Sequence, residues 1–390
     1  MVLDNIRKKY SLIVYVCIGI FCFCGVLGLT TFSQFYPDQN HYLLRFLKVI
    51  RFFLILIVID NFICNGFNLK KFAVFVFFMF ILAFSKTNTF ELFDLLFIPY
   101  LLNDKLDYKK VYKIYLVSII LCALLAFYLY FIDVLPTKMY HKFDIYKVYT
   151  LGFRHPNILG FVFLLLGILY FLLRKNITLL DSFILLLCSF GCFYITSSRT
   201  SVIIFILLSI LSIVCVFVKD LNNWDKNKLF YLSLLFYFSI IAIFYFLSFS
   251  EFGRHTFFEK YLRTVAARLY MGQEAFYQYG FSWLGQKIHF VGDYHLKGER
   301  YFVVDCLYMY LPIASGIITT VFFIASHVLA LKYTISKNDL RLFIVQILFI
   351  IFEMSEGLSY RNGLELFIFV LPFAGMFLNN QTKMNKQSSV

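Results

Sequence analysis

Charged residues are scarce in this chain. Asp, Glu, Lys and Arg make up 15% of its 390 residues, whereas 61% are hydrophobic and 52 are Phe. A soluble domain of this size does not need so much apolar surface. Apolar runs of membrane-spanning length recur along the whole chain, and short segments of alternating hydrophobicity are missing. The composition therefore excludes an ordinary soluble protein and predicts an all-α, polytopic membrane protein.

The motifs of several common site types are also missing. The nine cysteines lie within or beside apolar runs and show neither a disulfide framework nor zinc-type spacing. There is no nucleotide-binding loop and no cluster of metal ligands, so we expect no cofactor, no metal and no direct use of ATP. The net charge of +14 comes largely from Lys clusters between apolar runs, which is a signal of membrane topology. We therefore expect no nucleic-acid partner.

The apolar runs predict about twelve membrane spans within a single transmembrane domain, residues 1–390. The first run is too long for a signal peptide and lacks a small-residue cleavage site, so we interpret it as a retained helix. The candidate spans are roughly 11–31, 46–65, 72–85, 90–102, 113–132, 157–173, 178–196, 201–218, 229–249, 304–330, 342–357 and 364–379.

The basic residues between these spans predict the orientation. If the N-terminus is cytoplasmic, every cytoplasmic connection is basic, including those at 105–113, 174–175 and 332–341. Cytoplasmic loops of membrane proteins carry this bias. We therefore expect both termini in the cytoplasm. One of the outward connections, residues 250–303, is long and rich in aromatic side chains, so we expect it to cover the outer surface.

Arginine is concentrated on the predicted outer side, in contrast to lysine. A guanidinium offers a planar fork that matches phosphate oxygens. Arg154 and Arg199 stand where predicted helices begin, so partial positive charge from the helix ends adds to theirs. The pattern predicts a site for a phosphate-bearing lipid. The outward arginines are Arg154, Arg199, Arg254, Arg263, Arg268, Arg300 and Arg361.

Part of the long loop has the period of an amphipathic helix. Its apolar stripe comprises Phe258, Leu262, Val265, Leu269, Gly272 and Phe276. At 100° per residue, Arg268 falls on the edge of this stripe, whereas Arg263 points the opposite way. We therefore expect Arg268 to reach inward and Arg263 to face solvent or lipid headgroups.

A few other side chains are candidates for acid–base or ion-pairing roles. Asp305 stands where the long loop re-enters the membrane, and a carboxylate there is costly unless it is paired. It would either deprotonate a hydroxyl or pair with an arginine. His289 offers an imidazole in the long loop. Glu353 and Glu356 lie three residues apart on one helix face, and we expect them to pair with Arg361.

The order of these motifs resembles the O-antigen ligase and polymerase superfamily, and most closely its Wzy-type polymerases. The resemblance covers about residues 150–320. Ser201 stands where Gly often follows the Ser-Arg-Thr motif, and Cys306 stands where Asn often follows the Asp. The motifs are Arg154-His155-Pro156-Asn157 with Gly160, Ser198-Arg199-Thr200, Arg268, Leu284-Gly285-Gln286, and Asp305 with Tyr308 ahead of Gly316.

The resemblance implies a glycosyltransferase of the bacterial cytoplasmic membrane that polymerises capsule or O-antigen repeat units. Donor and acceptor would both be oligosaccharides on undecaprenyl pyrophosphate, and transfer would be metal-independent and inverting. A flippase and a chain-length regulator would be its protein partners. Either His289 or Asp305 would be the base, and the sequence does not choose between them. Pyrophosphate would be bound by Arg154, His155, Arg199 and Arg268, supported by Asn157, Tyr308 and Arg361.

Two alternatives stay open. A ligase of the same superfamily would attach a finished glycan to a different acceptor. A flippase of the same lipid-linked units would also suit about twelve spans. However, such transporters usually have two similar halves, whereas this chain has one long loop and no detectable internal repeat.

Overall fold

A computed structural model describes residues 2–65, 69–84, 107–135, 139–142, 146–218, 220–222, 224–250, 263–291 and 302–357. The helices in chain order are α1 (Val2–Leu27), α2 (Phe32–Phe35), α3 (Pro37–Asn65), α4 (Leu69–Phe84), α6 (Tyr108–Phe131), α7 (Pro156–Leu173), α8 (Leu179–Thr196), α9 (Arg199–Phe217), α10 (Lys226–Phe249), α12 (Arg263–Tyr279), α13 (Leu307–Tyr310), the π-helical turn η2 (Leu311–Ser315), α14 (Ile317–Ser336) and α15 (Leu340–Ser355). Strands β1 (Met139–Lys142) and β2 (Tyr146–Tyr149) pair antiparallel.

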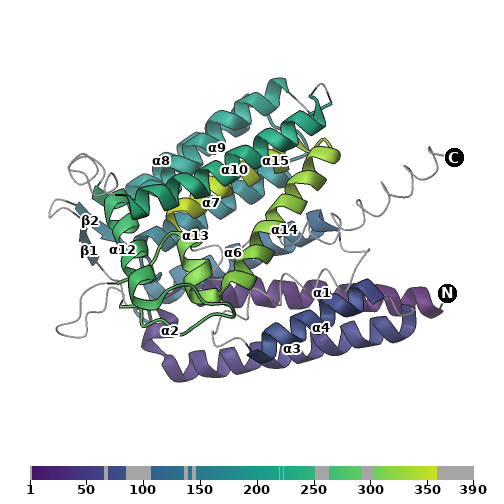
Figure 1. The fold of residues 1–390 in the computed structure, drawn as a ribbon. Helices are drawn as coiled ribbons and strands as arrows, with labels where there is room; N and C mark the ends of the chain where they lie inside the picture. Colours follow the sequence, from purple (N-terminus) through teal and green to yellow (C-terminus); the bar gives the residue numbers. More distant parts are fainter. Residues whose placement is uncertain are drawn as a thin grey trace.

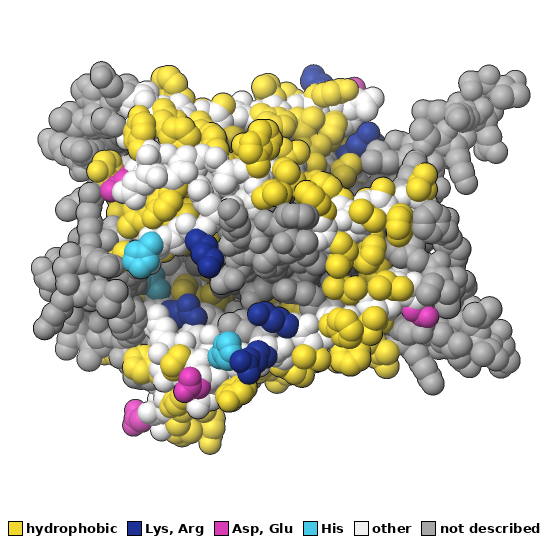
Figure 2. Space-filling model, turned by 60° about the horizontal axis from the view of Figure 1, so that its bottom comes forward, with side chains coloured by type: hydrophobic (Ala, Val, Ile, Leu, Met, Phe, Trp, Pro, Cys, Tyr) yellow, Lys and Arg dark blue, Asp and Glu magenta, His cyan; other side chains and the backbone are white. Residues whose placement is uncertain are grey.

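The chain is an α-helical membrane protein. Within the described ranges, six helices are long and apolar enough to cross a membrane: α6, α7, α8, α9, α10 and α14. On the face shown in Figure 2, apolar side chains cover much of the described surface. This is what contact with lipid requires, because a charged side chain facing lipid is costly.

The helices run side by side in layers (Figure 1). Helices α1, α3 and α4 lie along one side and α8, α9 and α10 along the other, with α12 crossing one end. Helix α7 is central: it contacts α6, α8, α9 and α15, and 67% of its span is buried, against 22–44% for the other five. The residues that precede α7 are therefore held by the most buried of these six helices.

Most predicted spans fall on helices of the structure. Those at 113–132, 157–173, 178–196, 201–218 and 229–249 correspond to α6 through α10, and those at 11–31, 46–65, 72–85 and 342–357 fall on α1, α3, α4 and α15. The runs at 90–102 and 364–379 lie outside the described residues, so the count of twelve stays a prediction.

The predicted span at 304–330 is only partly correct, because the helix long enough to cross a membrane is α14, which begins at Ile317. Between Cys306 and Ser315 the chain forms only α13 and η2, and Gly316 then separates them from α14. Gly316 has φ of 98°, which favours glycine, and a Cβ there would lie 2.5 Å from the amide nitrogen of Gly285. The chain breaks here because the long loop packs directly on its backbone. The pairing of β1 with β2 was not predicted from the sequence.

Contacts at one end of the bundle show that three basic connections lie together, as the charge pattern predicts. At one end, the Arg341 guanidinium donates to the carbonyl of Arg174, and the Tyr108 hydroxyl donates to Asp339 at 3.3 Å. The basic connections before α6, after α7 and before α15 therefore share one end. We call the opposite end, where α7 and α9 begin and α15 ends, the site end. Which end faces the cytoplasm stays a prediction.

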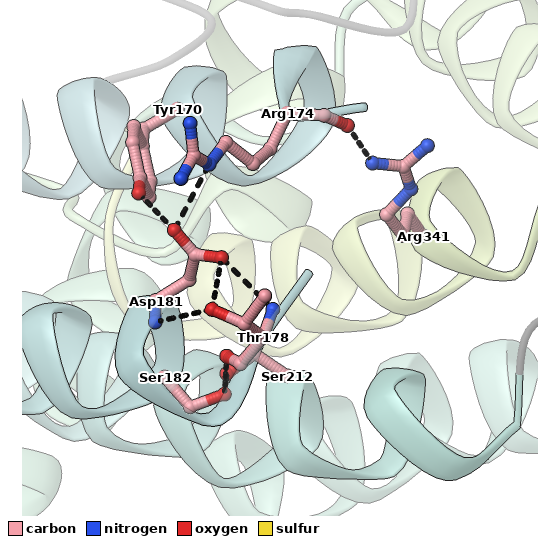
Figure 3. Close-up of polar contacts among 7 residues, drawn as sticks. All are labelled: Tyr170, Arg174, Thr178, Asp181, Ser182, Ser212 and Arg341. Atoms are coloured by element: carbon pink, nitrogen blue, oxygen red, sulfur yellow. Dashed lines mark hydrogen bonds and ion pairs between the residues drawn. The ribbon is translucent and has the colours of Figure 1, made fainter. Parts of the chain in front are cut away.

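A polar cluster fixes the turn between α7 and α8 at the end away from the site (Figure 3). Thr178 and Asp181 form a reciprocal capping box, in which each backbone amide donates to the other side chain, at 2.8 and 3.2 Å. Arg174 donates to the Asp181 carboxylate at 2.9 Å, and the Tyr170 hydroxyl donates to the same oxygen. These bonds hold α7 and α8 in register, which positions the start of α7 at the site end.

Candidate functional site

Helix α7 begins as the sequence predicts. His155 is its N-cap with an extended backbone, and Pro156 occupies the first helical position. The His155 Nδ1 accepts a hydrogen bond from the backbone amide of Asn157 at 3.1 Å. The predicted capping role of His155 is therefore confirmed. That ring nitrogen therefore faces the helix backbone.

Arg154 ties the start of α7 to the turn between α1 and α2. Its backbone amide donates to the carbonyl of Leu29 at 3.1 Å, its Nε donates to the carbonyl of Thr30 at 3.2 Å, and its Nη2 donates to the Ser33 hydroxyl. Burial lowers the pKa of the Arg154 guanidinium, because desolvation disfavours its charged form. These contacts give Arg154 an anchoring role, and its predicted part in binding pyrophosphate stays a prediction.

Helix α9 begins at Arg199, beside the start of α7. The predicted helix start is confirmed, and the Arg199 side chain is exposed. Ser198 is the N-cap residue, but its hydroxyl donates to Ser201 at 3.2 Å and does not cap the helix. A Cβ on Gly160 of α7 would lie 2.6 Å from the Cβ of Ser198. The two helix N-termini are thus brought together, and their partial positive charges add.

Helix α12 delivers Arg268 to this end of the bundle. The Arg268 Nη2 donates to the Glu356 carboxylate, its Nε lies 3.8 Å from Oδ2 of Asp305, and its Nη1 donates to the Thr200 hydroxyl at 3.3 Å. The Arg268 side chain is 12% exposed. Its predicted inward position is therefore confirmed, whereas its role stays a prediction.

The rest of the predicted stripe on α12 is only partly correct. Leu269 and Gly272 are buried and Phe276 is half-buried, as expected. The prediction that Val265 belongs to the buried stripe is wrong, because its side chain is exposed. Phe258 and Leu262 lie outside the described residues, and nothing is described of the Arg263 side chain.

Glu356 joins α7 to α12. It is the C-cap residue of α15. Its Oε1 accepts hydrogen bonds from the Arg268 guanidinium and from the side-chain amide of Asn157, the latter at 3.4 Å. Its predicted partner, Arg361, lies outside the described residues. Pairing with Arg268 was missed because the two residues are 88 positions apart. We call Arg268, Asp305, Glu356, Asn157 and Thr200 the Arg268 cluster.

A fully buried polar layer lies beneath this cluster. The Tyr308 hydroxyl donates to the carbonyl of Ile350 at 3.2 Å and to Oε2 of Glu353 at 3.3 Å. The His327 Nδ1 lies 3.8 Å from the same Glu353 oxygen and 3.3 Å from the Tyr237 hydroxyl. A buried carboxylate is costly unless paired, so this layer binds α10, α13, α14 and α15 together. Tyr308, predicted to support the site, thus holds the segment that follows Asp305.

The Leu284-Gly285-Gln286 motif fastens the long loop to η2. The Gln286 side-chain amide donates to the carbonyls of Tyr279, Gly280 and Ile313, at 3.0–3.1 Å. Its backbone amide donates to Ala314 at 3.0 Å. This clamp holds the segment that follows α12 against η2.

The two candidate bases lie in different surroundings. His289 is exposed on the loop segment that follows the Gln286 clamp. Asp305 has a side chain 29% exposed and 3.8 Å from Arg268, so it belongs to the Arg268 cluster. The structure therefore brings together Arg268, Asp305 and Asn157 of the predicted site residues, and places His155, Arg154 and Arg199 at the two adjoining helix starts.

The site thus combines the Arg268 guanidinium, two carboxylates and two helix N-termini, with Arg154 and Arg199 at those helix starts, at one end of an apolar bundle. Such a set can bind an anion and exchange a proton with a hydroxyl. No protein-family model, curated protein or solved structure matches the chain. Its function is therefore argued from this geometry.

Proposed function

We propose that this protein is a glycosyltransferase that polymerises oligosaccharide repeat units carried on undecaprenyl pyrophosphate. It would lie in a bacterial cytoplasmic membrane with about twelve spans, both termini in the cytoplasm and the site end outwards. One observation carries the proposal. A guanidinium and two carboxylates, drawn from three distant parts of the chain, meet beside two helix N-termini at the end of an apolar bundle.

The donor half of the reaction needs positive charge. When the bond between the sugar and the phosphate breaks, negative charge develops on the lipid pyrophosphate, and fixed cations stabilise it. Arg199 is exposed at the first position of α9, where its own charge and the helix N-terminus act together. Arg268 lies against Thr200, the next residue of that helix, so both guanidinium groups adjoin one end of α9.

The acceptor half needs a base. Asp305 is the better candidate, because it is partly exposed and stands within the Arg268 cluster, whereas Glu356 is 5% exposed and hydrogen-bonded to two groups. The acceptor hydroxyl would lose its proton to the Asp305 carboxylate as its oxygen bonds to the anomeric carbon. The bond from that carbon to the phosphate oxygen breaks, and its electron pair leaves with the pyrophosphate. One in-line displacement of this kind inverts the configuration.

The proposal is tested first in cells. Arg199→Ala removes the exposed cation of the donor site, so we expect polymer to be lost while the protein stays inserted in the membrane. Lys287→Ala is the matched control, because it removes the same charge from an exposed position on the long loop. Polymer of normal length in Arg199→Ala would contradict the proposed donor site.

The material that accumulates without the protein separates the proposal from its alternatives. A polymerase defect leaves single repeat units on the lipid carrier at the outer face. A ligase defect leaves long polymer on the carrier, and a flippase defect traps single units on the cytoplasmic side. Either of the last two patterns would refute polymerisation.

A further inference from the structure

The Arg268 cluster holds more negative than positive charge. Arg268 faces the carboxylates of both Asp305 and Glu356. A pyrophosphate that approached this guanidinium would therefore meet two carboxylates as well. Like charges brought together at close range are strongly unfavourable, so one carboxylate must give way before Arg268 can bind an anion.

The two carboxylates are held very differently. Glu356 is 5% exposed, caps α15, and accepts hydrogen bonds from both Arg268 and Asn157. Asp305 is 29% exposed and stands 3.8 Å from the Arg268 Nε, which is too long for a hydrogen bond. It also lies in the segment ahead of α13, outside any helix or strand. Asp305 is therefore the carboxylate that can leave.

We propose that Arg268 is a switch that couples binding of the donor pyrophosphate to release of Asp305. Before the donor binds, Arg268 pairs with Asp305 and keeps that carboxylate from an acceptor hydroxyl. The pyrophosphate takes the place of Asp305 on the guanidinium, while Glu356 keeps Arg268 in position. Asp305 is then free to face the acceptor. This inference rests on the proposed function, and it predicts that the donor binds before the acceptor is activated.

The test measures anion affinity, so it does not depend on turnover. Purified full-length protein in detergent with EDTA is titrated calorimetrically with inorganic pyrophosphate and, separately, with farnesyl pyrophosphate. Four proteins are compared: wild type, Asp305→Asn, Arg268→Gln and the double variant. Because Asp305→Asn removes the competitor and keeps the shape, we expect it to bind pyrophosphate about tenfold more tightly than wild type.

The double variant shows whether the gain passes through Arg268. In the Arg268→Gln background, Asp305→Asn should change the affinity less than about twofold, because there is no guanidinium left to compete for. Glu274→Gln is the matched control. It removes one carboxylate from α12, where Glu274 accepts a hydrogen bond from Gln278, and we expect unchanged affinity.

Two results would overturn the switch. One is an affinity of Asp305→Asn equal to that of wild type. The other is an equal gain with and without Arg268, which would reflect only the removal of a nearby negative charge. A gain with farnesyl pyrophosphate alone supports the switch and adds that the lipid chain is needed, whereas a gain with both ligands assigns recognition to the phosphates. If the expected coupling is found but no glycan is ever joined, the competition between Asp305 and a bound anion for Arg268 stands and polymerisation fails.

Discussion

Replacing Glu356 tests the geometry of the cluster without reference to any activity. Glu356→Ala leaves the guanidinium of Arg268, only 12% exposed, with Thr200 and the more distant Asp305. Breaking a buried ion pair by removing one partner costs about 3–5 kcal/mol. Since Arg268 keeps two partners, we expect a loss near the lower end, about 3 kcal/mol. Glu356→Gln keeps an acceptor for Arg268, so it should cost only about 1–1.5 kcal/mol.

The free energy of unfolding can be measured by adding SDS to the protein in mixed micelles and following the fluorescence of its two tryptophans, Trp224 and Trp283. The Arg268→Met/Glu356→Ala double variant should lose less stability than the two single losses added together. Glu274→Gln on α12, the helix that carries Arg268, should change the free energy of unfolding by less than about 0.5 kcal/mol. A loss of unfolding free energy below about 1 kcal/mol for Glu356→Ala would refute the buried pair of Arg268 and Glu356. Losses in the double variant equal to the sum of the two single losses would refute it as well.

Three further predictions concern the packing around the site. Gly316→Ala should lower the unfolding free energy by about 3 kcal/mol, because the added Cβ would clash with the backbone of Gly285. Gly280 has φ of 65° but open space around it, so Gly280→Ala should lower the unfolding free energy by only about 1 kcal/mol. Gly160→Ala should destabilise the contact between α7 and α9 by about 2 kcal/mol, whereas Gly191→Ala, in open space on α8, should not destabilise the protein. Thermal unfolding in detergent distinguishes the two variants, and equal melting temperatures would count against the helix contact. Tyr308→Phe should cost about 1–2 kcal/mol in SDS unfolding, because Ile350 and Glu353 lose a buried donor, and an unchanged midpoint would contradict the buried layer.

Local signals made the helix starts predictable. The sequence Arg154-His155-Pro156 contains a cap, a proline for the first turn and a following apolar run, and α7 begins at Pro156 as expected. Arg199 stands in a short polar stretch, residues 197–201, ahead of another apolar run, and α9 begins at this residue. The helical period likewise placed Arg268 at the inward edge of α12, because that inference needs only neighbours on one helix.

The missed features depend on contacts between distant parts of the chain. The run from 304 to 330 is largely apolar, and the Pro312 and Gly316 within it do not by themselves show where the helix breaks. The break arises because the backbone amides of Ile317 and Ile318 donate to the carbonyls of Ser282 and Trp283 in the distant loop. In the same way, no local pattern indicates that Glu356 meets Arg268, or that Arg154 is held by Thr30 and Ser33. Val265 is exposed although it fits the apolar stripe of α12, since only part of that face is covered.

The most direct measurement of the central claim is a reconstituted reaction. Purified protein in detergent would be mixed with an undecaprenyl-pyrophosphate-linked repeat unit, with a chelator and without nucleotide, and the products separated on a gel. We predict a ladder of lengthening glycans from the wild type and from Lys287→Ala, and none from Arg199→Ala. A wild-type protein that binds the lipid-linked unit but joins no two units would contradict the assignment of polymerisation.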